Sequence, residues 1–149
     1  MKILSISRPL YCQQRTLTIE NIHAETVALR LKSKSEFRYL ILDVREKSYY
    51  DQLHIKGAIN IESQEIMKWN DLSLLTPYLK DVNQLVLHCQ LSLIRSPACA
   101  LKIINLTKLK KDLGPMRIGL LTGGFKRWES LYGTNTDLCE GTKLSKNGP

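Results

Sequence analysis

Four short runs of largely apolar residues divide the chain, and each run is bounded by polar residues. The runs are Tyr39–Leu42, Ala58–Ile61, Leu85–Leu87 and Ile118–Leu121. Continuous apolar runs of this length are typical of strands that are buried on both faces of a sheet. The pattern therefore predicts four strands of a covered sheet.

Helical patterns separate most of these runs. Asn21 can cap a helix that runs to about Lys34. The other predicted helices span Glu62–Trp69, Leu72–Leu79, Ser96–Leu109 and Phe125–Leu131. Strands that alternate with helices predict an α/β fold, in which helices cover both faces of a mainly parallel central sheet.

The two ends of the chain lack such patterns. Residues 1–16 predict an irregular lead-in, and their short apolar patch is interrupted too early to make a good signal peptide. The polar stretch from Thr134 to Pro149 predicts a mobile tail. With 149 residues the chain has the size of one domain, whose core we expect between about residues 18 and 132.

Composition and charge narrow the classes of protein that remain. Hydrophobic residues make up 43% of the chain and charged residues 24%, as in soluble globular proteins. No apolar run approaches the roughly 18 residues of a membrane span, so we expect no membrane partner. The net charge of +8 favours an anionic partner. We find no groove-reading motif or aromatic interleaving for nucleic acid, which leaves phosphorylated protein or a small oxyanion.

The four cysteines, Cys12, Cys89, Cys99 and Cys139, form no CxxC pair and have no structural zinc spacing. The sequence therefore predicts no metal site and an intracellular protein with reduced thiols, in the cytoplasm or also in the nucleus. We expect Cys99 to be a buried thiol, although its position would allow a disulfide with Cys89. Cys12 and Cys139 lie in weakly patterned ends, where nothing supports a mobile resolving thiol.

One segment combines the end of a strand, a short loop and the start of a helix: His88-Cys89-Gln90-Leu91-Ser92-Leu93-Ile94-Arg95-Ser96-Pro97. A loop that turns back onto a helix N-terminus points its backbone N–H groups inward and forms a cradle for an anion. These N–H groups, the helix dipole and Arg95 all favour the Cys89 thiolate, and lower the pKa from about 8.5. Arg95 can also hold an oxyanion through two hydrogen bonds.

The chemistry predicted for this segment is attack by the Cys89 thiolate on a tetrahedral oxyanion. The residues expected to surround the oxyanion are Gln90, Leu91, Ser92, Leu93, Ile94 and Arg95. Ser96 can donate a hydrogen bond to the sulfur and make it a better leaving group. The alternative is that Cys89 is a small buried hydrophobe and Arg95 a surface cation, but their positions on either side of a five-residue loop favour a site.

The Cys89-x5-Arg95 spacing resembles the signature of cysteine-dependent phosphatases. Leu40–Glu46 and His54–Ile61 are similar to two characteristic segments of the rhodanese superfamily, Asp-Val-Arg and Gly-His-Ile-x-Gly-Ala. Leu120–Trp128 resembles its terminal Gly-Gly-Phe/Trp-x-x-Trp motif. The matches follow the superfamily's order from about Thr18 to Tyr132, so the chain is identified as rhodanese-like.

Loop length within this superfamily is associated with different chemistries. Sulfur-transferring rhodaneses typically have four residues between Cys and Arg, whereas cell-division-cycle dual-specificity phosphatases and eukaryotic arsenate reductases have five. The five residues here include Leu91, Leu93 and Ile94, and they look closest to small single-domain members of that branch from fungi and protists. The resemblance implies phosphate or arsenate chemistry without a cofactor. For arsenate it implies glutathione with glutaredoxin as the reductant.

The chain departs from the pattern at three positions. Leu53 stands where the family usually has Gly, Val44 where the larger phosphatases carry a second cysteine, and Gln90 where they carry a carboxylate. The proton donor to the leaving group is therefore unassigned, with Asp43, Glu46 and Glu129 as candidates.

The remaining polar residues are expected to support the loop or the fold. Asp43 and Arg45 either hold the loop in shape or form a structural ion pair. His88 is expected to bond the loop backbone rather than carry protons. His23 and His54 are expected to be structural, and Trp128 to lie in the core or at the rim of the pocket.

Three functions are consistent with these residues. The first is a phosphatase that forms a phosphocysteine and acts on phosphotyrosine or other phosphorylated protein. The second is an arsenate reductase that uses the same loop. The third is an inactive module that binds a phosphorylated partner, against which Cys89 and Arg95 argue. We favour the phosphatase, because no other cysteine is well placed for redox cycling.

Overall fold

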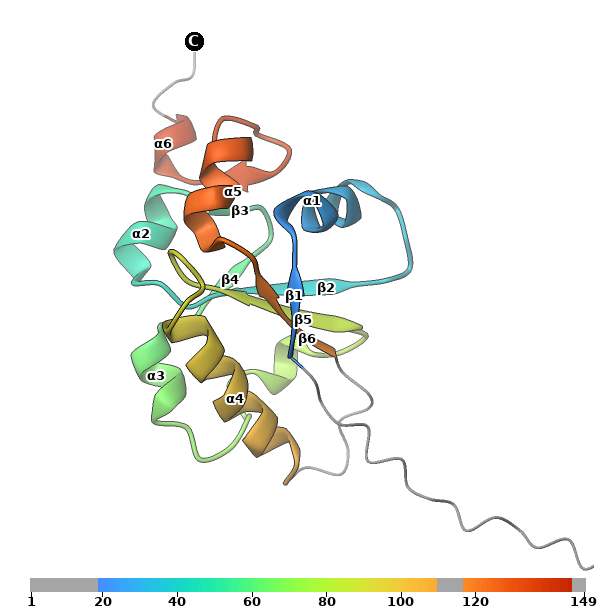
Figure 1. The fold of residues 1–149 in the computed structure, drawn as a ribbon, viewed down its shortest axis with the longest axis vertical. Helices are drawn as coiled ribbons and strands as arrows, with labels where there is room; N and C mark the ends of the chain where they lie inside the picture. The colour runs from blue at the N-terminus through green and yellow to red at the C-terminus, as the bar shows by residue number, and fades with distance from the viewer. Residues whose placement is uncertain (1–18, 110–116, 146–149) are drawn as a thin grey trace, which may run out of the picture.

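The centre of the computed structural model, which describes residues 19–109 and 117–145, is a five-stranded sheet (Figure 1). Its strands lie in the order β1-β6-β5-β2-β4, and every neighbouring pair is parallel. The strands are β1 (Ile19–Ile22), β2 (Tyr39–Asp43), β4 (Ile59–Asn60), β5 (Gln84–His88) and β6 (Arg117–Leu121). The predicted parallel α/β fold is confirmed.

Helices cover both faces of the sheet, which explains the continuous apolar runs. One face packs against α1 (Ala24–Lys32) and α5 (Gly124–Tyr132), and the other against α3 (Ser63–Met67) and α4 (Arg95–Thr107) (Figure 1). Successive residues of a strand point to opposite faces, so both must be apolar where both faces are buried. No helix in the described ranges is long and apolar enough to cross a membrane.

The predicted helix cap at Asn21 is wrong. Asn21 belongs to β1, where it pairs with Leu120 of β6, and α1 begins only after His23. The parallel pairing with β6 uses the backbone that a longer helix would need. The sequence hides this strand because Ile22 also fits the apolar spacing of the following helix.

The predicted helix over Leu72–Leu79 is also wrong. Only a short 3-10 helix, η1 (Thr76–Tyr78), forms in this segment. Leu72, Leu75 and Leu79 are buried at a spacing that imitates one face of an α-helix. Pro77 lacks the N–H that a continuing α-helix requires, and its ring clashes with the preceding turn.

The expected mobile tail from Thr134 is instead part of the fold as far as Ser145. β7 (Cys139–Glu140) pairs antiparallel with β3 (His54–Ile55), and α6 (Thr142–Ser145) follows. Cys139 is buried, and the indole Nε1 of Trp128 donates to its sulfur at 3.2 Å. These elements, with α2 (Lys47–Gln52), are too short for a periodic pattern to reveal. The lead-in, Cys12 and residues 146–149 lie outside the described residues.

The topology fixes where a site can form. β2, β5 and β6 are adjacent and parallel, so their carboxyl ends meet at one edge of the sheet. In such sheets ligands bind beyond the carboxyl ends of the strands. At this edge β5 leads into the loop 89–94, which ends where α4 begins.

Candidate active site

The loop after β5 wraps around the thiol of Cys89. The backbone N–H of Ser92 donates to Cys89 Sγ at 3.2 Å, and Ser96 Oγ lies 3.5 Å from the same sulfur. Ser92 has a φ of 56°, in the left-handed region that residues with a side chain rarely adopt. This conformation turns its N–H inward, and such strain persists only where the surrounding structure enforces it.

Hydrogen bonds decide the ionisation of Cys89. Burial by itself raises the pKa of this thiol, but donors from Ser96, Ser92 and Leu91 outweigh burial, and the pKa is lowered. Cys99, on the inner face of α4, has no such donors. Burial and the neighbouring Cys89 raise the pKa of Cys99 to about 11. The loop therefore favours a thiolate at Cys89, while Cys99 stays a neutral, buried thiol as expected.

Arg95 opens α4 and extends from the loop toward Glu46, just before α2. Its Nη1 donates to both carboxylate oxygens of Glu46 at 2.9 Å. Burial lowers the pKa of Arg95, but Glu46 and Cys89 together raise it, so the guanidinium remains a cation beside the thiol. The sequence offered Glu46 only as a proton donor. Its position directly after Asp-Val-Arg is the one signal that could have indicated this contact.

The start of α5 holds the loop from behind. The backbone N–H of Phe125 donates to the carbonyl of Cys89 at 2.9 Å, and that of Lys126 donates to the carbonyl of Gln90 at 2.9 Å. A Cβ on Gly124 would lie 2.4 Å from the Gln90 oxygen, and its φ is 62°. Only glycine fits there, which gives the Gly-Gly motif a role that its sequence alone did not reveal.

Asp43 and Arg45 form a buried ion pair beneath the loop. Arg45 Nη2 lies 2.7 Å from Asp43 Oδ2 and also donates to the carbonyl of Leu53 at 2.8 Å. The Arg45 guanidinium lies 3.8 Å from the centre of the Phe125 ring, which links the pair to the loop through α5. The structural ion pair is therefore confirmed, and a role in holding the loop in shape stays a prediction. Asp43 is fully buried, so it cannot reach a substrate as a proton donor.

His88 is buried against the backbone of the loop. Its Nδ1 lies 3.2 Å from the carbonyl oxygen of Cys89, and its Nε2 lies 3.7 Å from Asp43 Oδ2. Burial lowers the pKa of His88, so the ring is neutral and its Nδ1–H donates to the loop. This geometry agrees with a supporting residue. Glu129, the third candidate donor, pairs with Lys143 at 3.2 Å and has no contact with the loop among the described contacts.

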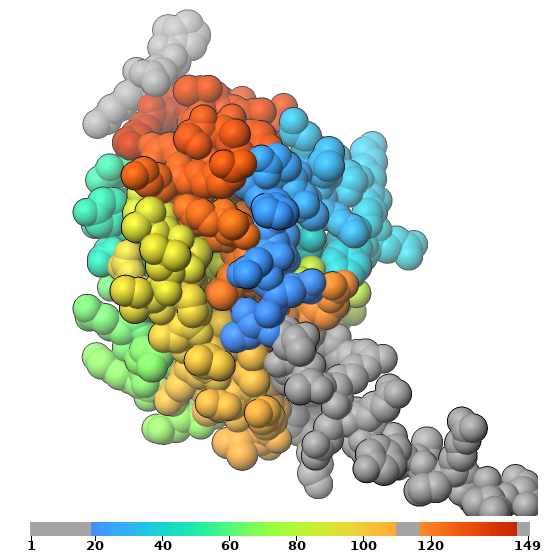
Figure 2. Space-filling model, viewed as in Figure 1, coloured from blue at the N-terminus to red at the C-terminus, as the bar shows by residue number. Residues whose placement is uncertain are grey.

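Three apolar side chains of the loop are exposed. Leu91, Leu93 and Ile94 are 46%, 73% and 80% exposed. In Figure 2 the yellow atoms of this part of the chain reach the surface next to the orange atoms of α5. These three side chains form an apolar rim on the outside of the loop, while the backbone N–H of Ser92 faces the sulfur.

Two departures from the family pattern have a structural explanation. Leu53 is buried and has an extended backbone with a φ of −162°, so no glycine is needed before His54. Val44 is fully buried in the core next to the sheet, with no thiol there to meet Cys89. His54 stacks on Tyr50 and lies 3.2 Å from Glu140, which is the structural role expected for it.

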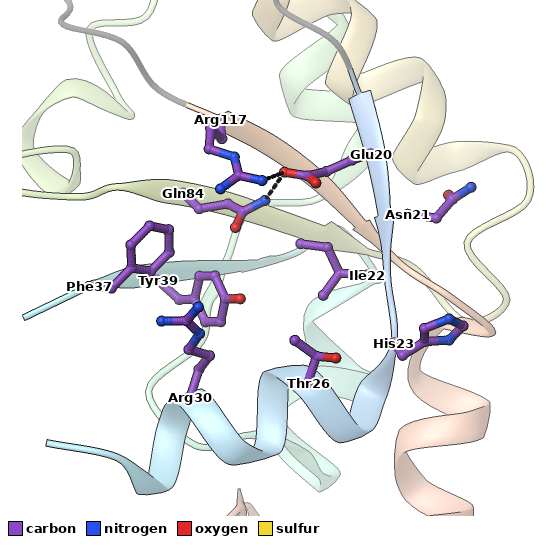
Figure 3. Close-up of a pocket in the computed structure, with 10 residues that line it drawn as sticks. All are labelled: Glu20, Asn21, Ile22, His23, Thr26, Arg30, Phe37, Tyr39, Gln84 and Arg117. Carbon is purple, nitrogen blue, oxygen red and sulfur yellow. Dashed lines mark hydrogen bonds and ion pairs between the residues drawn. The ribbon is translucent and has the colours of Figure 1, made fainter. Parts of the chain in front are cut away.

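A separate pocket of about 210 Å³ lies beside β1 and α1, near the amino-terminal ends of β2, β5 and β6 (Figure 3). It is lined by Glu20, Asn21, Ile22, His23, Thr26, Arg30, Phe37, Tyr39, Gln84 and Arg117. Glu20 accepts hydrogen bonds from Arg117 Nη2 at 2.7 Å and Gln84 Nε2 at 2.8 Å. None of the predicted site residues lines this pocket.

The sequence matches a known protein family and several known proteins. A family model described as Rhodanese-like domain matches residues 24–131. The chain is 36% identical over 91 residues to the dual specificity phosphatase Cdc25 of Arabidopsis thaliana, covering 60% of this chain and 61% of the relative. It is 31% identical over 108 residues to arsenate reductase 2.1 of Oryza sativa subsp. japonica, covering 72% of this chain and 66% of the relative. The matches thus span less than two thirds of either relative.

The fold has solved counterparts. The structure of Ygr203w from Saccharomyces cerevisiae, described as a homolog of single-domain rhodanese and the Cdc25 phosphatase catalytic domain, matches with a TM-score of 0.62. The two chains are 22% identical, and the match covers 83% of this chain and 88% of that one. At this identity the match supports the fold.

Proposed function

Because the chain belongs to the family of rhodanese-like domains, we propose that it is a cysteine-dependent phosphatase of this family. The observation that carries the proposal is the convergence of three groups on one sulfur. The Ser92 N–H, the Ser96 hydroxyl and the Arg95 guanidinium all surround Cys89, whose pKa is lowered. A buried thiol without a catalytic role has no need of these groups.

The proposed reaction has two steps. The Cys89 thiolate attacks the phosphorus of a phosphorylated protein, so that the S–P bond forms, the P–O ester bond breaks and the leaving oxygen takes a proton. Water then attacks the phosphocysteine, and Cys89 leaves as a thiolate while phosphate is released. The loop N–H groups and Arg95 stabilise the oxygens of both transition states.

The apolar rim favours a phosphorylated protein over a free oxyanion. An ester places its organic group at the entrance, where it can cover Leu91, Leu93 and Ile94 from water. Arsenate has no apolar part to do so. Phosphotyrosine suits such a rim best, because its ring is large and apolar.

Arsenate reduction is the second candidate, supported by the rice arsenate reductase that matches 72% of this chain. It uses the same thiolate and Arg95. Among the residues that the structure describes, Cys99 and Cys139 are both buried, so we expect the electrons to come from an external thiol such as glutathione with glutaredoxin. A module that only binds a phosphorylated partner would not need a thiol of lowered pKa.

Assays of one preparation with p-nitrophenyl phosphate, a phosphotyrosine peptide and arsenate with glutathione and glutaredoxin test the proposal. We expect turnover of both phosphoesters, and little transfer of sulfur from thiosulfate to cyanide. Cys89→Ser should abolish turnover and keep oxyanion binding, because the loop and Arg95 remain, whereas Arg95→Ala should damage both. If Cys89→Ser kept about a tenth of the activity toward every substrate, Cys89 would not be the nucleophile.

A further inference from the structure

Glu46 forms an ion pair with Arg95, the cation that the proposed reaction needs to bind its oxyanion. Both of its oxygens accept hydrogen bonds from Arg95 Nη1 at 2.9 Å, and its side chain is about half exposed. Cys89 also favours the charged form of Arg95 and raises its pKa, so one guanidinium interacts with both the carboxylate and the thiol. An oxyanion bound at Cys89 would meet the same guanidinium.

The groups around Glu46 favour its ionised form. Arg95 faces it from α4 and Arg45 from the preceding residue. Lys47 directs its ammonium to Asp51 at 2.8 Å. The hydrogen bond from its own backbone N–H, with Arg95, lowers the pKa of Glu46 in the absence of a ligand. Glu46 is therefore a carboxylate when an oxyanion arrives.

Two anions that share one guanidinium repel each other. The repulsion is greatest for a dianion beside an ionised carboxylate, and it falls when a proton is carried by either partner. Phosphomonoesters take up such a proton near a pKa of about 6. Sulfate stays a dianion throughout the neutral and mildly acidic range.

We propose that Glu46 determines specificity at this site: the site accepts oxyanions that carry a proton or share one with Glu46, and it disfavours full dianions. This rests on the proposed function, because it places the oxyanion between Cys89 and Arg95. The same proton completes the first step. As the S–P bond forms and the P–O bond breaks, the proton moves to the leaving oxygen, which departs as a neutral hydroxyl.

The other candidate carboxylates do not serve this role. Asp43 is fully buried in its ion pair with Arg45, and Glu129 on α5 pairs with Lys143 on α6. Gln90, the residue after the nucleophile, is an amide and cannot titrate. Glu46 is the candidate that touches Arg95.

Protection of Cys89 against iodoacetamide measures this specificity without turnover. Sulfate or phosphate is added at constant ionic strength, and modification of the Cys89 peptide is followed by mass spectrometry. Near pH 7 the half-protecting sulfate concentration should fall roughly fivefold to tenfold in Glu46→Gln. With phosphate at about pH 5.5, where it is a monoanion, we expect a change of less than about twofold.

Two further variants make the test specific. Glu129→Gln removes the same charge from a carboxylate without contact to Arg95, and should leave sulfate protection unchanged. Glu46→Asp keeps the charge and should keep the preference for phosphate over sulfate, which tests the proposal even if Glu46→Gln folds poorly. In turnover, kcat/KM of the native protein should decline above the second pKa of the ester, and Glu46→Gln should flatten that decline.

Sulfate protection that is unchanged in Glu46→Gln would overturn the proposal. Equal weakening of sulfate and phosphate would also overturn it, since Glu46 would then only hold Arg95 in position. Failure of the proposed function looks different: turnover would be absent in the native protein, while the sulfate and phosphate protection would still report on Glu46.

Discussion

The hydroxyl of Ser96 lies 3.5 Å from the sulfur of Cys89, at the start of α4, where both residues are buried. A hydroxyl that donates to sulfur stabilises the anion both when it attacks and when it leaves. The departure depends on it more, because the loop N–H groups already stabilise the free thiolate. In the proposed phosphatase reaction, we therefore expect Ser96 to have its larger effect on hydrolysis of the phosphocysteine.

Ser96→Ala should accumulate phosphocysteine and give a burst of leaving group followed by slow turnover. Losing one charge-assisted hydrogen bond costs about 1.5–3 kcal/mol, which slows the second step by about ten- to a hundredfold. Rapid-quench kinetics with trapping of the intermediate measures this directly. An unchanged steady-state rate with no trapped intermediate would mean that the hydroxyl serves only the start of the helix.

The pH dependence of Cys89 modification should report its lowered pKa. Only the thiolate reacts with iodoacetamide, so the reaction should stay fast as the pH falls below about 8.5, and slow only when the pH passes the lower pKa of Cys89. Ser96→Ala should move the midpoint upward, because it removes one donor to the thiolate. Cys99, whose pKa is about 11, serves as the internal control and should stay unmodified. A midpoint at or above about 8.5 would contradict the hydrogen-bond argument.

Gly124→Ala should damage activity more than Gly57→Ala. Both glycines have positive φ, 62° and 79°, so alanine at either position costs about 1–2 kcal/mol in backbone strain. Only at Gly124 would the added Cβ meet the loop, 2.4 Å from the Gln90 oxygen, whereas nothing lies within 4 Å at Gly57. Thermal unfolding and kcat/KM of the two variants separate strain from displacement of the loop. Equal activity in the two variants would show that the contact with Gln90 is dispensable.

Peroxide should inactivate the protein with poor recovery. A sulfenic acid on Cys89 needs a nearby thiolate to form a disulfide, but Val44 supplies no thiol, and Cys99 is neutral at physiological pH because its pKa is about 11. Oxidation should then continue to the irreversible sulfinic state. Mass spectrometry of Cys89 after brief and prolonged peroxide, with and without dithiothreitol, checks this. Full recovery together with a Cys89–Cys99 disulfide would show that Cys99 protects the nucleophile.

Local patterns made the loop and most of the sheet predictable. The run Leu85–Leu87, the cysteine at its end and Arg95 at the helix start all lie within one short segment. The chemistry of this segment could therefore be predicted from residues that lie close together in the sequence. The same holds for α5, where the two glycines mark the start of the helix.

Contacts between distant residues were not predictable in the same way. Glu46 and Arg95 lie far apart in the sequence, and only the parallel pairing of β2 with β5 brings their segments to one edge. The strand at Asn21 was mistaken for a helix start because its partner, β6, lies about a hundred residues further along the chain. Two-residue strands such as β3 and β7 carry no periodicity to detect.

The late position of α5 has a consequence for how the protein is made. The backbone N–H groups of Phe125 and Lys126 hold the carbonyls of Cys89 and Gln90. β1 joins the sheet by pairing with β6, which is synthesised much later. Contacts between residues so distant in sequence slow folding, because a long loop must close before they contribute. During synthesis Cys89 leaves the ribosome well before Phe125 and Lys126. A nascent chain that has not yet extended through α5 therefore carries Cys89 without the backbone contacts that hold its loop.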